Sequence, residues 1–450
     1  MNLILIVSDT LRRDHLGCYG KLGAHTPALD RFARDAVVFD EAYSGSFPTL
    51  PCRAEIFTGK FVFTYLNWGP LPRSEVLLSE TLAAAGYTCA MVTDNLPLCR
   101  SGYDYARGFH SLLRVRGQLY DNYAPLEGPV AWPCDPAKLG HGPDNRILQY
   151  LRNVAGRERE EDYFAPRVIQ EAIHWLEQNH RRSRFYLHVD IFDPHEPWDP
   201  PAEYVALHDT VGDGDDVIRP NMGPADAYSD ADIRRMRALY AGEVTMVDRW
   251  LGRLFDTLDA LGRREDTVVA FLSDHGLFLG ERGRLGKLGK SEHNVKGWAP
   301  YWELSQIPLL IRAPGIAPAR TRAFAHPGDV SPTLLQLAGV PIPPTMRTGS
   351  LVPVLRGEQD RIRDIAVSSW SLRGWSVHRP SVARTDEWSL VYWRGGVPPE
   401  LYHRPTDPHE EHNVYSTHRT EARDVHRRYL SFIRAHGAGL GHSLPRSFGV

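Results

Sequence analysis

The sequence predicts an α/β protein organised around a mostly parallel sheet with helices on both faces. Runs of branched apolar residues recur at 3–7, 86–93, 184–190 and 266–272. A continuous apolar run of this length is typical of a strand buried on both faces of a parallel sheet. Segments with helical spacing lie between these runs, which is the order expected of a doubly wound sheet.

Composition excludes several classes of partner. The 52 basic and 55 acidic side chains give a net charge of −3, which provides no footprint for nucleic acid or an anionic membrane. The five cysteines are an odd number and include no C-x-x-C pair, so we expect reduced thiols. The apolar run at 2–7 is too short for a signal sequence or a membrane span. We therefore expect a cytoplasmic protein.

Ser8, Asp9 and Thr10 directly follow the first apolar run. Ligands of open α/β sheets gather at the carboxyl ends of the strands, so Asp9 is placed to hold a metal ion or a substrate group. The alternative is that Asp9 only caps a following helix. The residues alone leave both interpretations open.

A helix is predicted to begin at Thr49, because Pro51 suits the first turn of a helix. Thr49 is the expected N-cap, and Arg53 lies one turn further on the same helix face. The hydroxyl and the guanidinium would then form an anion site near the positive end of the helix dipole. The alternative is an ordinary N-cap followed by a solvated arginine.

Further elements follow in order. The aromatic stretch 60–70 is interpreted as packing, with a substrate wall as the alternative. Residues 120–162 are rich in proline, glycine and charge and predict a long surface loop or lid. The spacing also predicts helices at 79–85, 163–178 and 227–261 and a strand at 307–312.

Asp274 and His275 end the apolar run at 266–272. The pair supplies one hard oxygen and one imidazole nitrogen, which suits Ca²⁺, Mg²⁺, Mn²⁺ or Zn²⁺ depending on the other ligands. Beyond this region, short strand-like runs and a final helix from Glu421 predict a smaller α+β subdomain. We place the catalytic domain at 1–344 and the subdomain at 345–450.

Several of these motifs resemble the sulfatase family of the alkaline phosphatase superfamily. Thr49-Leu-Pro-Cys-Arg53 with Thr58-Gly59 resembles the family signature C/S-x-P-x-R…T-G. Residues 9–20, the segment Asp193-Pro-His195 and Ser273-Asp-His-Gly276 resemble other family segments, and the likeness extends from residue 2 to about 414. The resemblance implies an alkaline-phosphatase-like fold and hydrolysis of a small-molecule phosphate or sulfate ester.

The resemblance also assigns site residues, position by position. It implies metal ligands at Asp9, Thr49, Asp274 and His275, with Arg53, His195 and Lys287 contacting the transferred group or the leaving oxygen. One divalent cation is expected. A second stays open, for which Asp193, His195 and His293 are candidates, although the D-P-H spacing differs from that of known two-zinc members.

The departures from the family pattern fall on important positions. Thr49 stands where sulfatases carry a cysteine or serine that is oxidised to formylglycine, and threonine cannot give that aldehyde. Thr10 stands where many sulfatases have a second aspartate, and Arg282 replaces a usual histidine. The sulfate-binding G-K-x-H motif is missing after Thr93. These changes indicate that the transferred group is not a simple sulfate.

We therefore predict a metal-dependent hydrolase of phosphate mono- or diesters, such as a phosphodiesterase. The cation would lower the pKa of the Thr49 hydroxyl, which would attack as an alkoxide and form an ester that water then cleaves. One alternative is a sulfuric ester hydrolase that works without formylglycine. Another is a catalytically silent metal-binding protein. The oligomeric state stays open.

Overall fold

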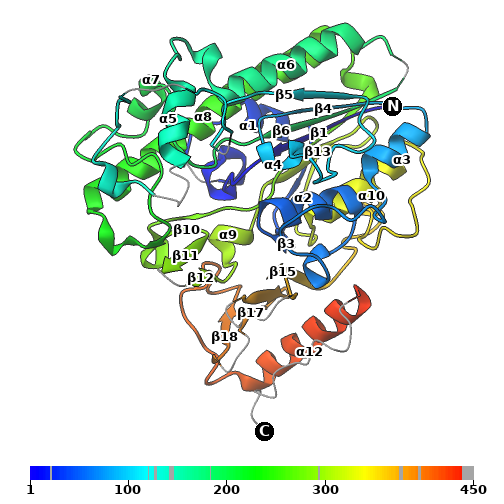
Figure 1. Ribbon diagram of the computed structural model, residues 1–450. Coiled ribbons are helices and arrows are strands. Elements are labelled where there is room, and N and C mark those ends of the chain that lie inside the picture. Colours follow the sequence, from blue (N-terminus) through cyan, green and yellow to red (C-terminus); the bar gives the residue numbers. More distant parts are fainter. Residues whose placement is uncertain are drawn as a thin grey trace.

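The computed structural model describes residues 1–20, 23–119, 121–125, 129–140, 146–182, 184–291, 294–373, 379–393 and 397–437. A large sheet lies between layers of helices, and a smaller sheet with one long helix lies below it in Figure 1. Within the described chain the large sheet has eight strands, in the order β14 (Ala319–Thr321), β2 (Val37–Phe39), β13 (Leu309–Arg312), β8 (Thr267–Ser273), β1 (Asn2–Ser8), β6 (Phe185–Ile191), β4 (Thr88–Thr93) and β5 (Ser111–Arg114).

The large sheet is mostly parallel, as predicted. β1 pairs in parallel with β6 and with β8, whereas β13 runs antiparallel to both of its neighbours. Strand β1 shows why its sequence is apolar throughout. Ile4 and Ile6 pack into one core, while Leu3, Leu5 and Val7 pack into the other, so that each face of the strand is covered.

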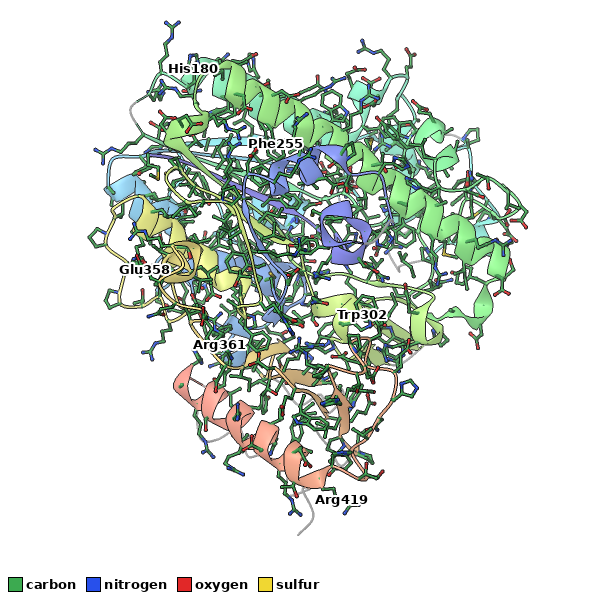
Figure 2. The ribbon with its side chains drawn as sticks, turned by 180° about the vertical axis from the view of Figure 1, so that it is seen from behind. His180, Phe255, Trp302, Glu358, Arg361 and Arg419 are labelled. Carbon is green, nitrogen blue, oxygen red and sulfur yellow. The ribbon has the colours of Figure 1, made fainter. Side chains whose placement is uncertain are left out.

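Helices form a layer on each face of the large sheet. One core contains residues of α1 (Pro27–Ala33), α5 (Arg146–Val154), α6 (Phe164–Asn179), α7 (Ala202–Ala206) and α8 (Asp230–Ala260). The other contains residues of α2 (Thr49–Thr58), α3 (Leu78–Ala84), α4 (Leu96–Cys99), α10 (Val330–Leu337) and α11 (Val352–Leu355). Figure 2 shows α8 crossing the back of the molecule, with Phe255 near its C-terminal end.

The smaller sheet has five strands in the described chain, in the order β18 (Glu400–His403), β17 (Trp388–Tyr392), β16 (Ser381–Arg384), β15 (Ala366–Trp370) and β3 (Ser46–Phe47). Helix α12 (Arg419–Ala435) packs on this sheet and begins near the bottom of Figure 2. β3 comes from the N-terminal part of the chain and lies directly before α2. The expected division at 344 and 345 stays a prediction, because this strand joins the two parts.

Short elements complete the described chain. They are the sheet of β7 (Gly223–Pro224), β10 (Arg284–Gly286) and β9 (Phe278–Leu279), the hairpin of β11 (Leu288–Ser291) and β12 (Asn294–Gly297), and the helix α9 (Trp302–Ser305). The residues 120–162, expected as loop or lid, include α5. Among the described helices, none has both the length and the apolar character needed to cross a membrane.

Glu55 joins β3, α2 and the segment before α10 at one buried point. Its carboxylate accepts hydrogen bonds from the Ser46 amide at 2.6 Å and the Gly328 amide at 3.4 Å. Burial raises the pKa of this carboxyl to about 8. The folded state therefore holds the Glu55 proton more tightly than the unfolded state does.

This linkage predicts a pH-dependent stability. The contribution of Glu55 is fully present below its ordinary pKa and is lost as the pH rises through about 8. The unfolding free energy of the wild type should therefore fall as the pH rises from the ordinary glutamate pKa to about 8. In urea denaturation at a series of pH values, Glu55→Gln is expected to show a shallower fall, with a slope that differs by at most about 1.4 kcal/mol per pH unit. Equal slopes in the two proteins would contradict the assignment. Glu80→Gln, on the partly exposed α3, is the control.

Candidate active site

The register of the large sheet brings two of the predicted ligands together. Ser8 at the end of β1 lies opposite Ser273 at the end of β8, so Asp9 and Asp274 leave adjacent strands at the same level. The Asp274 carboxylate accepts hydrogen bonds from the amides of Thr10 at 2.8 Å and His275 at 2.7 Å. These bonds fix the Asp274 side chain against the loop after β1.

The loop after β1 is held in an uncommon conformation. Thr10 has φ 63°, in the left-handed region that few residues other than glycine adopt. The hydroxyl of Tyr240, on α8, donates to the Thr10 carbonyl and accepts from the Arg12 amide, each at 2.8 Å. The Thr10 hydroxyl donates to Asp9 at 2.6 Å. This bond orients the Asp9 carboxylate, and a role of Thr10 as a metal ligand stays a prediction.

Thr49 lies opposite these strand ends, at the start of α2. Its Oγ1 is 3.2 Å from Nε2 of His275. The helix begins at Thr49 with Pro48 as the N-cap, so the expectation that Thr49 itself caps the helix was wrong by one residue. The His275 Nδ1 lies 3.0 Å from the Gly276 carbonyl and donates to it, which leaves the Nε2 lone pair directed at Thr49.

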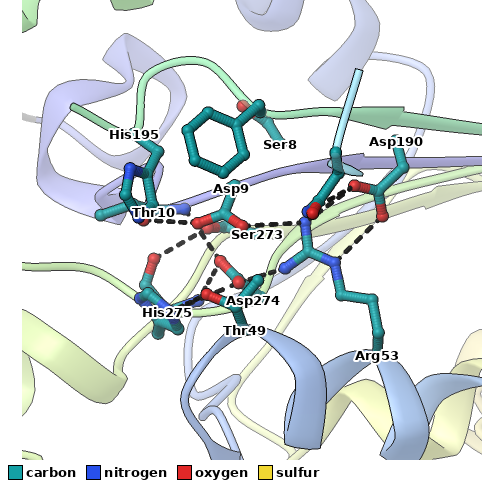
Figure 3. Close-up of polar contacts among 12 residues, drawn as sticks. Ser8, Asp9, Thr10, Thr49, Arg53, Asp190, His195, Ser273, Asp274 and His275 are labelled. Atoms are coloured by element: carbon teal, nitrogen blue, oxygen red, sulfur yellow. Dashed lines mark hydrogen bonds and ion pairs between the residues drawn. The ribbon is translucent and has the colours of Figure 1, made fainter. Parts of the chain in front are cut away.

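Arg53 lies at the centre of a buried network of carboxylates. Figure 3 shows its side chain leaving α2 and reaching Asp190 on one side and Asp274 on the other. Nε and Nη2 contact the two oxygens of Asp190 at 3.0 and 3.1 Å, Nη1 contacts Asp274, and Nη2 lies 3.4 Å from Asp9. Arg53 is on the same side of α2 as Thr49, as predicted, but its donors are directed at carboxylates.

Burial and charge set the protonation states of this network. Burial by itself raises the pKa of Asp190, and Arg53 together with His188 more than reverses this, so the pKa lies below its usual value. Burial and the nearby Lys287 lower the pKa of His275 well below its usual value. His275 is therefore a neutral imidazole at pH 7, which is the form that binds metal.

The donor set fits one divalent cation. Asp9, Asp274 and His275 each offer a ligand atom, and these atoms lie within 4.8 Å of one another. Oδ2 of Asp9 is buried and accepts no hydrogen bond. Three carboxylates, of Asp9, Asp190 and Asp274, face the two cations Arg53 and Lys287, so a negative charge remains for a bound cation to balance.

His195 and Lys287 lie on the strand side of the same centre. Lys287 donates to the Thr10 hydroxyl at 3.2 Å, and Figure 3 shows the His195 ring beside Thr10 and Asp9. The His195 Nδ1 donates to the Glu196 carbonyl at 2.7 Å. Burial and Lys287 lower the pKa of His195 to about 3, so its imidazole is neutral with Nε2 unprotonated.

Two of the sequence candidates that the structure describes, Asp193 and Arg282, are not brought to this centre. Asp193 contacts the side chain of Gln118 at 3.2 Å and the Ala165 amide at 3.1 Å, so its oxygens are occupied by the wall of the site. Arg282 pairs with Glu303 at 2.9 Å and donates to carbonyls at 409 and 410, which makes it a link to the C-terminal part of the chain. His293 lies outside the described residues.

Sequence reasoning missed Asp190, the main partner of Arg53. The signal was present, because Asp190 ends an apolar run in the same way as Asp9 and Asp274 do. It also missed Asn95, whose side-chain amide donates to Asp190 at 3.3 Å. Tyr240 gave no signal, since a tyrosine at helical spacing in the 227–261 segment fits packing equally well.

Known proteins show similarity over nearly the whole chain. A family model described as Sulfatase matches residues 1–340, and one described as N-sulphoglucosamine sulphohydrolase, C-terminal, matches 298–431. The chain is 25% identical to the multifunctional alkaline phosphatase superfamily protein PehA of Trinickia caryophylli, covering 97% of this chain and 95% of that protein. It is 24% identical to an arylsulfatase of Clostridium perfringens, covering 98% and 96%.

A solved structure shows the same fold. The phosphonate monoester hydrolase SpPMH from Silicibacter pomeroyi superposes with a TM-score of 0.75 at 22% sequence identity, covering 97% of this chain and 96% of that one. This likeness confirms the predicted architecture of a large, mostly parallel sheet with a C-terminal subdomain.

Proposed function

Since the chain belongs to the sulfatase family and is thus a hydrolase of ester bonds, we propose that it hydrolyses phosphate esters through Thr49. The observation that carries this proposal is the Thr49 hydroxyl, 3.2 Å from an unprotonated His275 nitrogen and beside the Asp9 and Asp274 carboxylates. An oxygen nucleophile in this position can attack an ester and become esterified itself.

Phosphate is favoured over sulfate by the residue type at position 49. A formylglycine hydrate expels sulfate by reforming its aldehyde, whereas an ester on threonine must be cleaved by a second attack at the transferred group. A relative named as a phosphatase-superfamily protein and a structural neighbour named as a phosphonate hydrolase support the same choice. Asp94 and Asn95 also follow β4, where many sulfatases place a lysine and a histidine.

Asp9, Asp274 and His275 would hold the cation, with Thr49 as the fourth ligand. Bound there, a divalent cation supplies positive charge that lowers the pKa of the Thr49 hydroxyl and offsets charge on the transferred group. Arg53 keeps the Asp9 and Asp274 carboxylates in place from the opposite side. The dipole of α2 adds positive potential at Thr49, the first residue of the helix.

Lys287 and His195 act in the two chemical steps of the proposed reaction. In the first step the Thr49 hydroxyl gives up its proton to solvent, and its oxygen bonds to phosphorus as the bond from phosphorus to the leaving oxygen breaks. Lys287 supplies the positive charge or proton that the leaving oxygen needs. In the second step water attacks the phosphothreonine ester. His195, whose Nε2 is unprotonated, accepts a hydrogen bond from that water and orients it. One proton of the water passes to the Thr49 oxygen, which leaves as the hydroxyl, and inorganic phosphate or a phosphate monoester is released.

The test uses protein stripped of metal and reloaded separately with Mn²⁺, Zn²⁺, Ca²⁺ or Mg²⁺. Each form is assayed on 4-nitrophenyl phosphate, bis(4-nitrophenyl) phosphate and 4-nitrophenyl sulfate. Turnover of a phosphate ester that depends on the added metal is expected. Turnover of the sulfate ester alone would replace the proposal by the sulfatase alternative, and no turnover with any metal would favour the catalytically silent member.

A further inference from the structure

We propose that a cavity lined by Trp68, Leu96, Arg100 and Leu119 binds the leaving group of the ester, and that this leaving group is negatively charged and carries a flat ring. The cavity has a volume of about 680 Å³ and lies between α4, the start of α5 and the segment at Trp68. The inference rests on the proposed function, since it names the class of ester that the same site accepts.

Two residues that line the cavity directly follow, in the sequence, residues of the site or of its wall. Leu96 follows Asn95, whose amide contacts Asp190. Leu119 follows Gln118, which bridges the carboxylates of Asp94 and Asp193 at 3.3 and 3.2 Å. These two residues connect one side of the cavity to the wall of the site.

A third wall of the cavity is connected to the helix that carries Thr49. Trp68 precedes Gly69, whose carbonyl accepts a hydrogen bond from the Tyr105 hydroxyl at 3.1 Å. The same hydroxyl lies 3.3 Å from the carbonyl of Leu50, the residue after Thr49. Tyr105 thus ties the Trp68 segment to the first turn of α2.

The charges of the cavity select an anion. Arg100 and Arg146 line it, and no aspartate or glutamate is among the described residues that do. Arg100 is exposed, and its guanidinium contacts the Tyr103 hydroxyl at 3.3 Å, with no carboxylate partner among the described residues. An arginine against an aromatic hydroxyl keeps most of its donors available for a carboxylate or phosphate.

The volume of the cavity and the exposed indole of Trp68 favour a ligand that carries a flat ring. Trp68 is 47% exposed, although Phe61 and Phe63 of the same aromatic stretch are buried in the core against α12. The interpretation of this stretch as packing is thus confirmed for the two phenylalanines and not for Trp68. An indole left open at a cavity wall gains free energy when a flat ring covers it. The volume suits a small molecule of one or two rings.

The experiment compares two esters that differ in one charge. 4-Carboxyphenyl phosphate and 4-carbamoylphenyl phosphate have nearly the same size, and release of inorganic phosphate reports both. The metal-loaded enzyme is expected to show a lower KM for the carboxylate ester. Arg100→Gln should abolish this preference, raising that KM about fivefold while leaving the KM of the carbamoyl ester unchanged. Trp68→Ala should raise KM for both.

Arg73→Gln is the matched control, because Arg73 is an exposed arginine near this face that does not line the cavity. An unchanged ratio of the two KM values in Arg100→Gln would overturn the proposal. If neither ester is hydrolysed, the proposed function fails. Calorimetric titration with 4-hydroxybenzoate and 4-hydroxybenzamide then still tests whether the cavity prefers an anionic ring. The proposal is supported if the wild type binds 4-hydroxybenzoate more tightly than 4-hydroxybenzamide and Arg100→Gln loses this difference. Equal binding of the two compounds by the wild type refutes it.

Discussion

Thr49→Ala is expected to lose metal-dependent phosphoesterase activity by roughly 10³-fold or more, because the substitution removes the hydroxyl that we propose forms the esterified intermediate. Thr49→Ser should keep a large part of the activity, since serine offers a hydroxyl from the same backbone position. The measurement is kcat on the preferred nitrophenyl ester at saturating metal. Acid quenching followed by peptide mass spectrometry should find the phosphoryl group on Thr49 in the wild type.

Thr58→Ala serves as the control for this series. Thr58 lies on the same helix and is equally buried, but its hydroxyl donates to the Ala54 carbonyl within the helix. Its loss should affect stability and leave the chemistry in place. Metal-dependent turnover that persists undiminished in Thr49→Ala would show that another group carries out the first attack.

Arg53→Met is expected to lower the free energy of unfolding by about 3–5 kcal/mol, the usual cost of removing one partner from a buried ion pair. Arg53 is 0% exposed and contacts Asp190 with two nitrogens, so its removal leaves buried carboxylates without a counter-charge. Urea denaturation of the metal-free protein measures the change. A loss below about 1 kcal/mol would show that the carboxylates are solvated or protonated at little cost.

A double variant separates charge from packing in the same network. Asp190→Asn removes one of the carboxylates that Arg53 neutralises, so Arg53→Met with Asp190→Asn should be less destabilised than Arg53→Met alone. If the two substitutions add, the interaction between Arg53 and Asp190 contributes little and the effect comes from volume. Arg31→Met is the matched control, because Arg31 pairs with Asp256 on the surface.

The part of the site that is proposed to hold the cation was predictable in three residues, Asp9, Asp274 and His275, because they follow strands. Asp9 and Asp274 end apolar runs, and such runs are found in parallel sheets whose carboxyl ends meet at one edge. Thr49 and Arg53 were predictable from their spacing, since one helical turn places both on one side of α2. The family signature then identified the chemistry that these positions share.

The partners of each side chain were not predictable. Arg53 was expected to face a substrate oxygen, and in the fold its donors reach Asp190 and Asp274, which are 137 and 221 residues away in sequence. Asp193 and Arg282 have residue types that suit a site, yet their contacts lie with Ala165 and Glu303. Pairings at such separations depend on strand order and register, which local patterns do not encode.

By itself the sequence determined the type of fold, the strand ends that carry the proposed ligands and the threonine proposed as nucleophile, because apolar runs, helical spacing and motif residues are local properties. Only the tertiary structure decided that Tyr240 holds the Thr10 loop, that β3 joins the smaller sheet, and that Trp68 and Arg100 line one cavity. These features arise when distant segments pack together, and packing is a property of the whole chain.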